Sequence, residues 1–176
     1  MSTRRNPNIL ITGTPGTGKT TLAESIAQTF GYKHIDVSSL VKEKDLHDGF
    51  DEEFQCWVLD EDKVCDEMED QMTNGGVVVD HHSCEWFPER WFDLVIVLRT
   101  DTKELTDRMI KRKYNQLKID NNIDCEIMQL ILQEAFSSYK EEIIMELQSS
   151  TIEDNENNQQ IISDWTKQFV QSRQQQ

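Results

Sequence analysis

The chain has 176 residues, of which 36% are hydrophobic and 29% are charged, a composition that predicts one soluble globular domain. No apolar stretch exceeds five residues and the start "MSTRRNPNIL" lacks an apolar core, so we expect neither a membrane span nor a secretory signal. The net charge of −15 disfavours direct nucleic-acid binding, because lysine and arginine supply most of the affinity for a phosphate backbone.

The first elements expected along the chain are a buried strand and an amphipathic helix. "NILIT" at 8–12 is a continuous apolar run of β-branched character, as in a strand covered on both faces. Apolar residues then recur at helical spacing from Lys19 to Phe30, and Gly31 stands where a C-cap glycine is favoured. "YKHIDV" at 32–37 predicts a second, short strand.

An acidic segment comes next in the chain. Ser38 and Ser39 are both candidate caps for a short helix that runs through Lys44. The stretch "HDGFDEEFQCW" predicts a turn-rich acidic loop. Asp60 or Asp62 would then open a helix with an apolar inner face. That face consists of Val64, Cys65, Met68 and Met72.

The second half of the chain repeats the alternation of strands and helices. "NGG" marks a turn, and "VVVD" and "DLVIVLR" predict two further buried strands. Helices are expected at 102–113, at 124–147 and around Ile161–Phe169, the last after a polar break "NENNQQ" with a cap at Asp154 or Asn155. The alternation predicts an α/β fold of three layers with a parallel central sheet, in one domain over residues 1–176. Residues 172–176 are expected to form a flexible tail.

The most specific pattern is "GTPGTGKT" at 13–20, which satisfies the phosphate-loop motif G-x-x-x-x-G-K-[ST] in full. Gly13, Gly16 and Gly18 allow the backbone to bend so that successive N–H groups point into one concavity. The loop lies between a predicted strand and a predicted helix, and the helix adds its positive N-terminal end. The alternative, a tight turn without a ligand, explains none of this context.

The residues after the loop predict how a nucleotide is held. Lys19 is expected to reach the β- and γ-phosphates of ATP, and the Thr20 hydroxyl is the expected Mg²⁺ ligand. Thr21 is placed to contact the α-phosphate. ATP and Mg²⁺ are therefore the predicted cofactors.

A second motif follows the strand at 77–80. Asp80 ends this buried strand, at the edge where α/β proteins hold their ligands, and is the candidate that orients Mg²⁺. If the extended conformation continues, His82 points to the same side as Asp80 and would orient an attacking water or a substrate oxygen. The alternatives are a histidine that is hydrogen-bonded within the loop, or a metal site with His81 and Cys84, for which no fourth ligand has suitable spacing.

A third feature is a basic segment in an otherwise acidic chain. Seven of the eighteen basic residues lie in it, namely Arg99, Lys103, Arg108, Lys111, Arg112, Lys113 and Lys118. Arg108 and Arg112 are four residues apart and therefore share a helical face. Converging guanidinium groups would stabilise the negative charge of a phosphoryl-transfer transition state, whereas the alternative is a solvated helix face.

Taken together, the motifs resemble one known family. The stretches "ILITGTPGTGKTTL", "DGFDEEFQCWVLDEDKV", "GGVVVDHHSCEWFPERWFDLVIVLRTDT" and "CEIMQLILQEAFSSYKEEI" are similar to those of the adenylate kinase isoenzyme 6 family, small nuclear and cytoplasmic nucleoside monophosphate kinases. The resemblance runs from Asn8 to Trp165. It implies a P-loop NTPase fold with a five-stranded parallel core, a monophosphate-binding region at 36–59 and a short lid at 111–121.

The resemblance also implies roles for individual residues. The implied ATP contacts are Gly16, Gly18, Lys19, Thr20, Thr21 and Arg112. Asp80 and His82 match the family's Asp-x-His, an altered Walker B motif associated with ATP hydrolysis as well as transfer, and Arg108 would complete the phosphate clamp. Ser39 and Lys42 are the expected contacts of the acceptor nucleotide.

Three positions depart from the family pattern. Lys42 stands where arginine is usual, so a point charge replaces a planar fork and acceptor binding is expected to be weaker. Ser83 and Lys113 both stand where glycine is usual, and the second is expected to stiffen lid closure. None of the three lies in the phosphate loop.

Two functions follow from the resemblance. The first is adenylate kinase activity, in which ATP phosphorylates a nucleoside monophosphate with AMP as the expected acceptor. The second is an ATP-hydrolysing assembly factor for the small ribosomal subunit, bound to a ribosomal protein and needed for 18S rRNA processing. The acidic surface suits a basic ribosomal-protein tail. A GTPase is disfavoured, because the chain has no Asn-Lys-x-Asp element that reads guanine.

The remaining expectations concern the protein's surroundings. Cys56, Cys65, Cys84 and Cys125 show neither a CxxC pair nor a disulfide spacing, which is typical of free thiols in the cytosol or nucleus. The resemblance implies a monomer in the nucleus and cytoplasm, bound to a pre-ribosomal particle through protein and not through direct nucleic-acid or membrane contacts.

Overall fold

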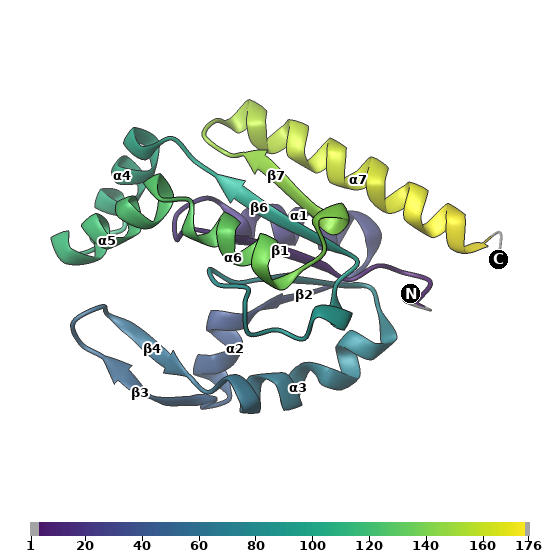
Figure 1. The fold of residues 1–176 in the computed structure, drawn as a ribbon, viewed down its shortest axis with the longest axis horizontal. Coiled ribbons are helices and arrows are strands. Elements are labelled where there is room, and N and C mark those ends of the chain that lie inside the picture. Colours follow the sequence, from purple (N-terminus) through teal and green to yellow (C-terminus); the bar gives the residue numbers. More distant parts are fainter. Residues whose placement is uncertain (1–3, 175–176) are drawn as a thin grey trace.

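The structure, a computed structural model that describes residues 4–174, has a five-stranded parallel sheet in the order β2-β5-β1-β6-β7 (Figure 1). Its strands are β1 (Ile9–Gly13), β2 (Lys33–Asp36), β5 (Val77–Asp80), β6 (Leu94–Arg99) and β7 (Ile144–Gln148). The helices are α1 (Lys19–Phe30), α2 (Val37–Glu43), α3 (Glu61–Asn74), α4 (Thr102–Lys111), α5 (Gln116–Ile127), α6 (Leu130–Ser138) and α7 (Ile152–Gln174). The predicted α/β fold with a five-stranded parallel core is confirmed.

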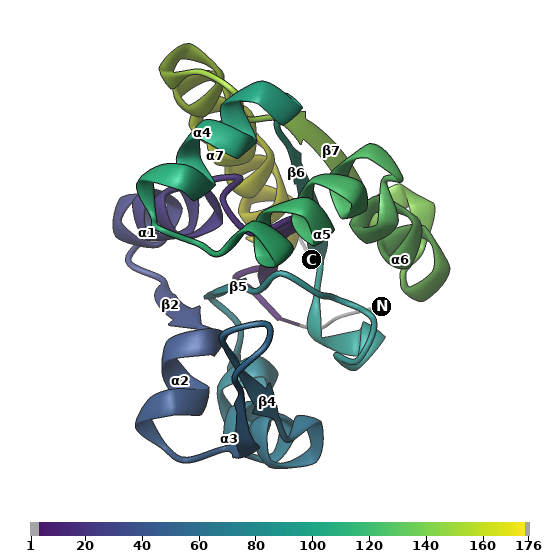
Figure 2. The same ribbon diagram turned by 90° about the vertical axis from the view of Figure 1, so that its left-hand side faces the viewer.

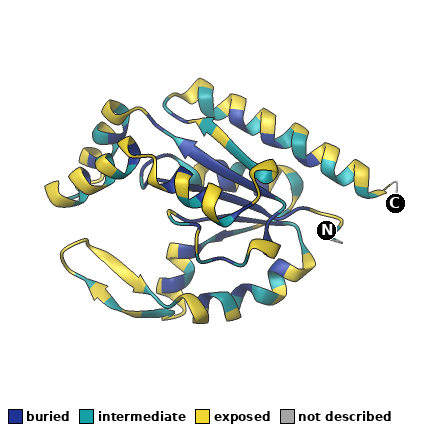
Figure 3. Ribbon diagram, viewed as in Figure 1, coloured by how far each residue is buried: buried dark blue, intermediate teal, exposed yellow. Residues whose placement is uncertain are grey.

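Strand β1 lies at the centre of the sheet because its apolar side chains are covered on both faces. All five of its residues are buried, as are those of β5 (Figure 3). Ile9 is in register with Val78 of β5 and with Leu94 of β6. The carboxyl ends of β1 and β5 therefore meet at one edge, which places the phosphate loop beside Asp80.

Two hydrophobic cores lie on opposite faces of the sheet and define the three layers. On one face, Ile9 and Ile11 pack with Ile26 of α1 and Ile162 of α7. On the other face, the core draws on β1, α3 and α6 through Leu10, Val64, Met68, Met72, Ile131, Leu132 and Ala135. Figure 2 shows α1 and α7 on one side of the sheet and α6 on the other.

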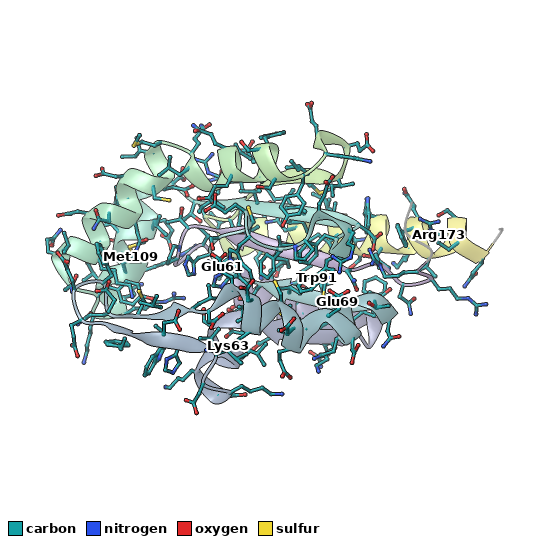
Figure 4. The ribbon with its side chains drawn as sticks, turned by 60° about the horizontal axis from the view of Figure 1, so that its bottom comes forward. Glu61, Lys63, Glu69, Trp91, Met109 and Arg173 are labelled. Carbon is teal, nitrogen blue, oxygen red and sulfur yellow. The ribbon has the colours of Figure 1, made fainter. Side chains whose placement is uncertain are left out.

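Polar contacts hold helix α3 at its start and at Glu69 in its second half. The Asp60 side chain accepts a hydrogen bond from the Lys63 N–H, so Asp60 is the cap of this helix, one of the two residues predicted for it. Val64, Met68 and Met72 are buried as expected, whereas Cys65 is only half-buried. The Trp91 indole N–H donates to Glu69 at 3.0 Å, and Figure 4 shows these two side chains next to each other.

The segment predicted as an acidic loop is a β-hairpin, and that prediction is wrong. Strands β3 (His47–Asp51) and β4 (Cys56–Leu59) pair antiparallel, apart from the main sheet. The Trp57 ring contacts the rings of His47 and Phe50, with centroids 4.1 and 5.1 Å away, and these cross-strand contacts stabilise the pair. In Figures 1 and 2 the hairpin projects toward the end of the molecule that carries α4 and α5.

Several expected boundaries also need correction. The cap of α2 is Asp36, whose carboxylate accepts from the Ser39 N–H and hydroxyl, so neither Ser38 nor Ser39 is the cap. The helix expected at 102–113 ends at Lys111 as α4. The single helix expected at 124–147 is instead the end of α5, the whole of α6 and most of the edge strand β7.

Helix α7 begins before the expected polar break and continues beyond the expected end. The Asp154 carboxylate accepts from the Thr151 N–H, and the Thr151 hydroxyl accepts from the Asp154 N–H, so the pair caps this helix reciprocally. The tract "NENNQQ" is helical, and buried Asn158 donates to the Gln148 carbonyl at 2.8 Å. Residues 172–174 of the predicted tail belong to α7, and residues 175–176 lie outside the described residues.

Helices α4 and α5 form a small satellite to the main domain. Leu105 and Met109 of α4 pack against Ile119 of α5 in a third apolar cluster. The connection between them contains Lys113 in the left-handed region with φ +58°. Within residues 4–174, no helix is long and apolar enough to span a membrane.

Candidate active site

The phosphate loop connects β1 to α1 through three glycines in conformations that suit no other residue. Gly13, Gly16 and Gly18 have φ values of +149°, +95° and +91°. A Cβ atom at Gly13 would lie 2.7 Å from the Leu98 carbonyl oxygen and 2.9 Å from the Thr17 hydroxyl. The loop therefore packs tightly on β6 at Gly13, where glycine is favoured by the lack of space as well as by backbone freedom.

Lys19 lies at the start of α1, with its ammonium group turned back over the loop. Its Nζ donates to the Thr14 carbonyl at 3.2 Å, and the same carbonyl accepts from the Thr17 hydroxyl at 2.9 Å. Burial, with a smaller contribution from the Arg112 charge, lowers the pKa of Lys19 to about 8, although the Asp80 carboxylate acts in the opposite direction. An anion bound in the loop would raise this pKa again, because it stabilises the protonated form.

This pKa predicts that ATP affinity depends on pH. Bound phosphates stabilise the protonated form of Lys19, so affinity is fully present below pH 8 and is lost as the pH rises above it. We expect the dissociation constant for ATP, measured by calorimetry, to rise about tenfold from pH 7.5 to 9.5. The Lys19→Arg variant, whose guanidinium stays charged, should show a flat profile, and a wild-type profile that is equally flat would contradict the assignment.

Two side chains with oxygen atoms suited to metal binding face each other at the carboxyl edge of the sheet. The Thr20 hydroxyl donates to Asp80 Oδ1 at 3.1 Å, and the Asp80 side chain is buried. A hydroxyl and a carboxylate are ligands of the kind that Mg²⁺ prefers, and the pair lies next to the loop, so these residues fit a magnesium ion. The structure thus brings Thr20 and Asp80 together as the sequence predicted.

His34 of β2 contacts the other oxygen of Asp80 and was not expected from the sequence. Its Nε2 is hydrogen-bonded to Asp80 Oδ2, and this bond raises the pKa of His34. Asp36 and Asp80 are in register on β2 and β5, which brings the two strand ends together. The imidazole therefore holds the carboxylate in the orientation that faces Thr20.

The two histidines after Asp80 differ in their surroundings. His81 is buried against Trp86 and Phe87, its ring centroid 5.5 and 6.1 Å from theirs, and burial keeps its pKa well below the usual range. Strand β5 ends at Asp80, so strand alternation does not fix the side to which His82 points. His82 is exposed, and desolvation by the surrounding chain together with the Lys19 and Lys118 charges lowers its pKa to about 4, so its ring is neutral at pH 7.

Arg108 and Arg112 have different surroundings, although both belong to the predicted clamp. The Arg108 guanidinium donates to the Gly16 carbonyl at 3.1 Å and to the Ser149 and Ser150 carbonyls at 3.1 and 3.0 Å. It therefore connects the loop to the segment after β7, and its contact with a migrating phosphoryl group stays a prediction. Arg112 is exposed, and within the described residues its side chain makes no hydrogen bond or ion pair.

A cavity of about 450 Å³ adjoins the phosphate loop. Gly16, Gly18 and Thr21 line it on the side of the loop, Arg108 and Arg112 on the side of α4. The opposite wall consists of Ser149, Ser150, Thr151, Ile152 and Asn155. This volume is in the range of small-molecule sites.

The residues expected to contact an acceptor lie on α2. Lys42 is exposed at the last turn of this helix, and Ser39 donates its hydroxyl to Asp36 at 2.8 Å. Across the site, the tip of the hairpin touches the start of α5. The side chains of Asn115 and Lys118 each donate to a hairpin carbonyl, those of Glu53 and Gln55, at 3.3 Å.

The comparisons with known proteins agree with this geometry. Residues 9–129 match a family described as an AAA domain. The adenylate kinase isoenzyme 6 homolog of Dictyostelium discoideum is 69% identical over 97% of this chain and 98% of its own length. Homologs of the same name in Caenorhabditis elegans and Saccharomyces cerevisiae are 49% and 40% identical, over 95% and 97% of this chain and 93% and 88% of their own lengths.

Solved structures show the same fold at low identity. A shikimate kinase from Bacteroides thetaiotaomicron has a TM-score of 0.58 at 15% identity and aligns with 90% of this chain and 97% of its own. A gluconokinase from Sinorhizobium meliloti has a TM-score of 0.51 at 14% identity, over 92% and 95%. At these identities the likeness concerns the fold alone.

Proposed function

The chain belongs to the adenylate kinase isoenzyme 6 family, and from this we propose that it transfers the terminal phosphoryl group of ATP to a nucleoside monophosphate, with AMP as the preferred acceptor. The observation that carries this proposal is the juxtaposition of Lys19 on the phosphate loop with the Thr20–Asp80 pair. One group of residues can thus neutralise a phosphate chain and hold its counter-ion.

The donor nucleotide would occupy the loop and the adjoining cavity. Backbone N–H groups at Gly16 and Gly18 and the N-terminal end of α1 attract phosphate oxygens. Lys19 would leave the Thr14 carbonyl and bind the β- and γ-phosphates. The cavity next to Thr21 offers space for the nucleoside.

Thr20 and Asp80 would hold Mg²⁺, which supplies charge neutralisation to the phosphate chain when it is bound. Asp80 acts from a buried strand end, oriented by His34. Because both residues are fixed by the sheet and by α1, they need little rearrangement to act as ligands.

Transfer itself depends on position and charge, with no general base from the protein. Arg112 has no hydrogen-bonding partner among the described residues, and its charge acts on Lys19, so its guanidinium is free to stabilise negative charge as it develops. Lys42 on α2 and the hairpin would hold the acceptor on the opposite side. The contacts of Asn115 and Lys118 with the hairpin carbonyls would close the site and exclude water.

A rate measurement tests the proposal. ADP production from ATP should rise several-fold when AMP is added, because the positioned acceptor replaces water. The measurement is a coupled assay with each of the common nucleoside monophosphates, in the presence and absence of Mg²⁺. A rate that is indifferent to every monophosphate would contradict the kinase activity.

Hydrolysis of ATP is the second candidate, favoured by the neutral His82 ring beside Lys19. A neutral imidazole can accept a hydrogen bond from water and orient it toward a phosphoryl group. We propose that this activity serves maturation of the small ribosomal subunit and 18S rRNA processing in the nucleus and cytoplasm, through a monomer bound to a basic ribosomal protein on the pre-ribosomal particle. Retention of ribosomal proteins with and without ATP tests the role, and no nucleotide-sensitive partner would contradict it.

The contribution of His82 can be separated from binding. The His82→Gly variant should bind ATP normally, because the loop contacts are untouched, and should hydrolyse it about tenfold more slowly. Calorimetry gives the affinity and phosphate release gives the rate, both without acceptor. Unchanged hydrolysis would remove His82 from the mechanism.

A further inference from the structure

One residue of the phosphate loop is tied to a distant helix. The Thr14 side chain is 1% exposed, and its hydroxyl donates to Glu126 Oε2 of α5 at 2.6 Å. The two residues are 112 positions apart in the chain. A short hydrogen bond to a buried carboxylate is among the stronger polar contacts in a protein, so this contact restrains the loop.

Glu126 is itself held rigidly. Its other carboxylate oxygen, Oε1, accepts from Arg99 Nε at 2.6 Å and from the Thr100 N–H at 3.1 Å. The Glu126 carbonyl also accepts from Arg99 Nη2, at 3.0 Å. Both Arg99 and Thr100 lie at the carboxyl end of β6, so the carboxylate has a fixed position relative to the sheet.

The restraint reaches the residues that would contact ATP. The Thr14 carbonyl accepts from Lys19 Nζ and from the Thr17 N–H and hydroxyl. Thr14 therefore links Glu126 on one side to the phosphate-binding lysine on the other. A change in the orientation of Thr14 would displace the bend of the loop and the resting position of Lys19.

The helix that carries Glu126 also contacts the β3–β4 hairpin. Helix α5 begins directly after the α4–α5 connection, and its first turns contact the β3–β4 hairpin through Asn115 and Lys118. Its last turn carries Glu126. The helix thus spans from the hairpin at one end to the phosphate loop at the other.

We propose that Glu126 is a positioning residue for the donor nucleotide: through Thr14 it holds the phosphate loop in its binding conformation before ATP arrives. Preorganisation of this kind lowers the cost of ordering the loop upon binding. The inference rests on the proposed use of ATP. It assigns to α5 a role at the donor site in addition to the contact of that helix with the hairpin.

Paired substitutions at Thr14 test the proposal. Thr14→Val keeps the shape and removes the hydroxyl, whereas Thr14→Ser keeps the hydroxyl. We expect Thr14→Val to raise both the dissociation constant and the KM for Mg-ATP about tenfold, and Thr14→Ser to stay within about twofold of wild type. The KM for AMP should not change in either variant, so the effect is confined to the donor site. A loss of folded protein would lower the maximal rate and leave the KM for Mg-ATP unchanged.

Substitutions of the carboxylates provide the second arm. Glu126→Gln removes the negative charge that makes this hydrogen bond strong, so it should weaken ATP binding in the same direction as Thr14→Val. The double variant should be no weaker than Thr14→Val alone, since both substitutions act on one contact. Glu146→Gln is the matched control, because Glu146 also pairs with Arg99, at 3.2 Å, but does not contact the loop. It should leave ATP affinity unchanged.

The outcomes separate this inference from the proposed function. If wild-type protein does not bind ATP, the proposed function fails. If wild-type protein binds ATP but Thr14→Val binds it as tightly as Thr14→Ser, only the role of Glu126 is overturned. Equal weakening by Glu126→Gln and Glu146→Gln would also overturn it, because the effect would then come from Arg99. Thermal unfolding of each variant checks that the compared proteins are folded. If Glu126→Gln does not fold, the comparison of Thr14→Val with Thr14→Ser alone tests the proposal.

Discussion

Replacement of Lys19 by alanine is expected to lower the rate of phosphoryl transfer about 1,000-fold and to abolish measurable ATP hydrolysis. Lys19 is the cation of the phosphate-loop motif itself, and in the free protein its ammonium group donates to the Thr14 carbonyl, from which a phosphate can displace it. Without its ammonium group, the phosphate chain would lose the side-chain cation that the loop itself supplies, and the backbone dipoles, Arg112 and Mg²⁺ would have to stabilise the charge that accumulates during transfer. The initial rate at saturating ATP and AMP measures the effect.

The Lys19→Ala protein should lose activity and remain folded. Burial lowers the pKa of Lys19, so its charge costs folding free energy at neutral pH, and removal of the group should leave the unfolding midpoint within about 4 °C of wild type. Lys33→Ala is the control, because Lys33 is exposed at the start of β2. A Lys19→Ala protein that is folded and retains a tenth of the wild-type rate would contradict the role assigned here.

Replacement of Asp80 by asparagine is the second large effect that we expect. The amide keeps the shape of the side chain and can still bond to Thr20 and His34, but it removes the negative charge that would hold Mg²⁺. The turnover number should fall about 100-fold, and the gain in ATP affinity that wild type shows upon addition of Mg²⁺ should disappear. Calorimetric titrations of ATP with and without Mg²⁺ measure this gain independently of catalysis.

Asp101→Asn is the matched control for this substitution. Asp101 follows β6, is exposed, and caps α4 without a side-chain hydrogen bond. Its replacement should change neither turnover nor the effect of Mg²⁺. If Asp80→Asn still binds ATP more tightly with Mg²⁺ than without, the ion is held by other residues.

The parts of the fold that could be predicted from sequence are those specified by local pattern. Strand β1 and the phosphate loop are encoded by a short apolar run and by glycines at fixed spacing, so their place and type follow from contiguous residues. Asp80 could be predicted because its strand is apolar up to that residue. Local signals of this kind depend little on the rest of the chain.

The edge strand β7 could not be predicted, because its sequence "IMELQ" consists mostly of good helix formers. It forms a strand because β6 offers a free edge, with Ile144 in register with Val95. The polar tract at 155–160 led to the opposite error, because it was expected to be a break and is part of α7. It is helical because the Thr151–Asp154 cap starts α7 upstream of it.

The site residues that were missed are held by contacts between distant positions. His34 lies 46 residues from Asp80, and nothing in "YKHIDV" marks its histidine as a partner of the carboxylate. Arg108 and Arg112 line the same cavity although Arg112 follows the end of α4, but spacing could not show that carbonyl oxygens would bind the Arg108 guanidinium. Periodicity gives the face of a helix and not the group that it meets.

Lys113 holds the turn between α4 and α5 in a left-handed backbone conformation. A side chain in this region costs about 1 kcal/mol relative to glycine, which corresponds to about a fivefold change in an equilibrium constant. The observed turn between α4 and α5 is therefore populated in a smaller fraction of molecules with lysine at position 113 than it would be with glycine. A nucleotide that requires the observed turn would thus bind to a smaller fraction of molecules, and its apparent affinity would be reduced in proportion.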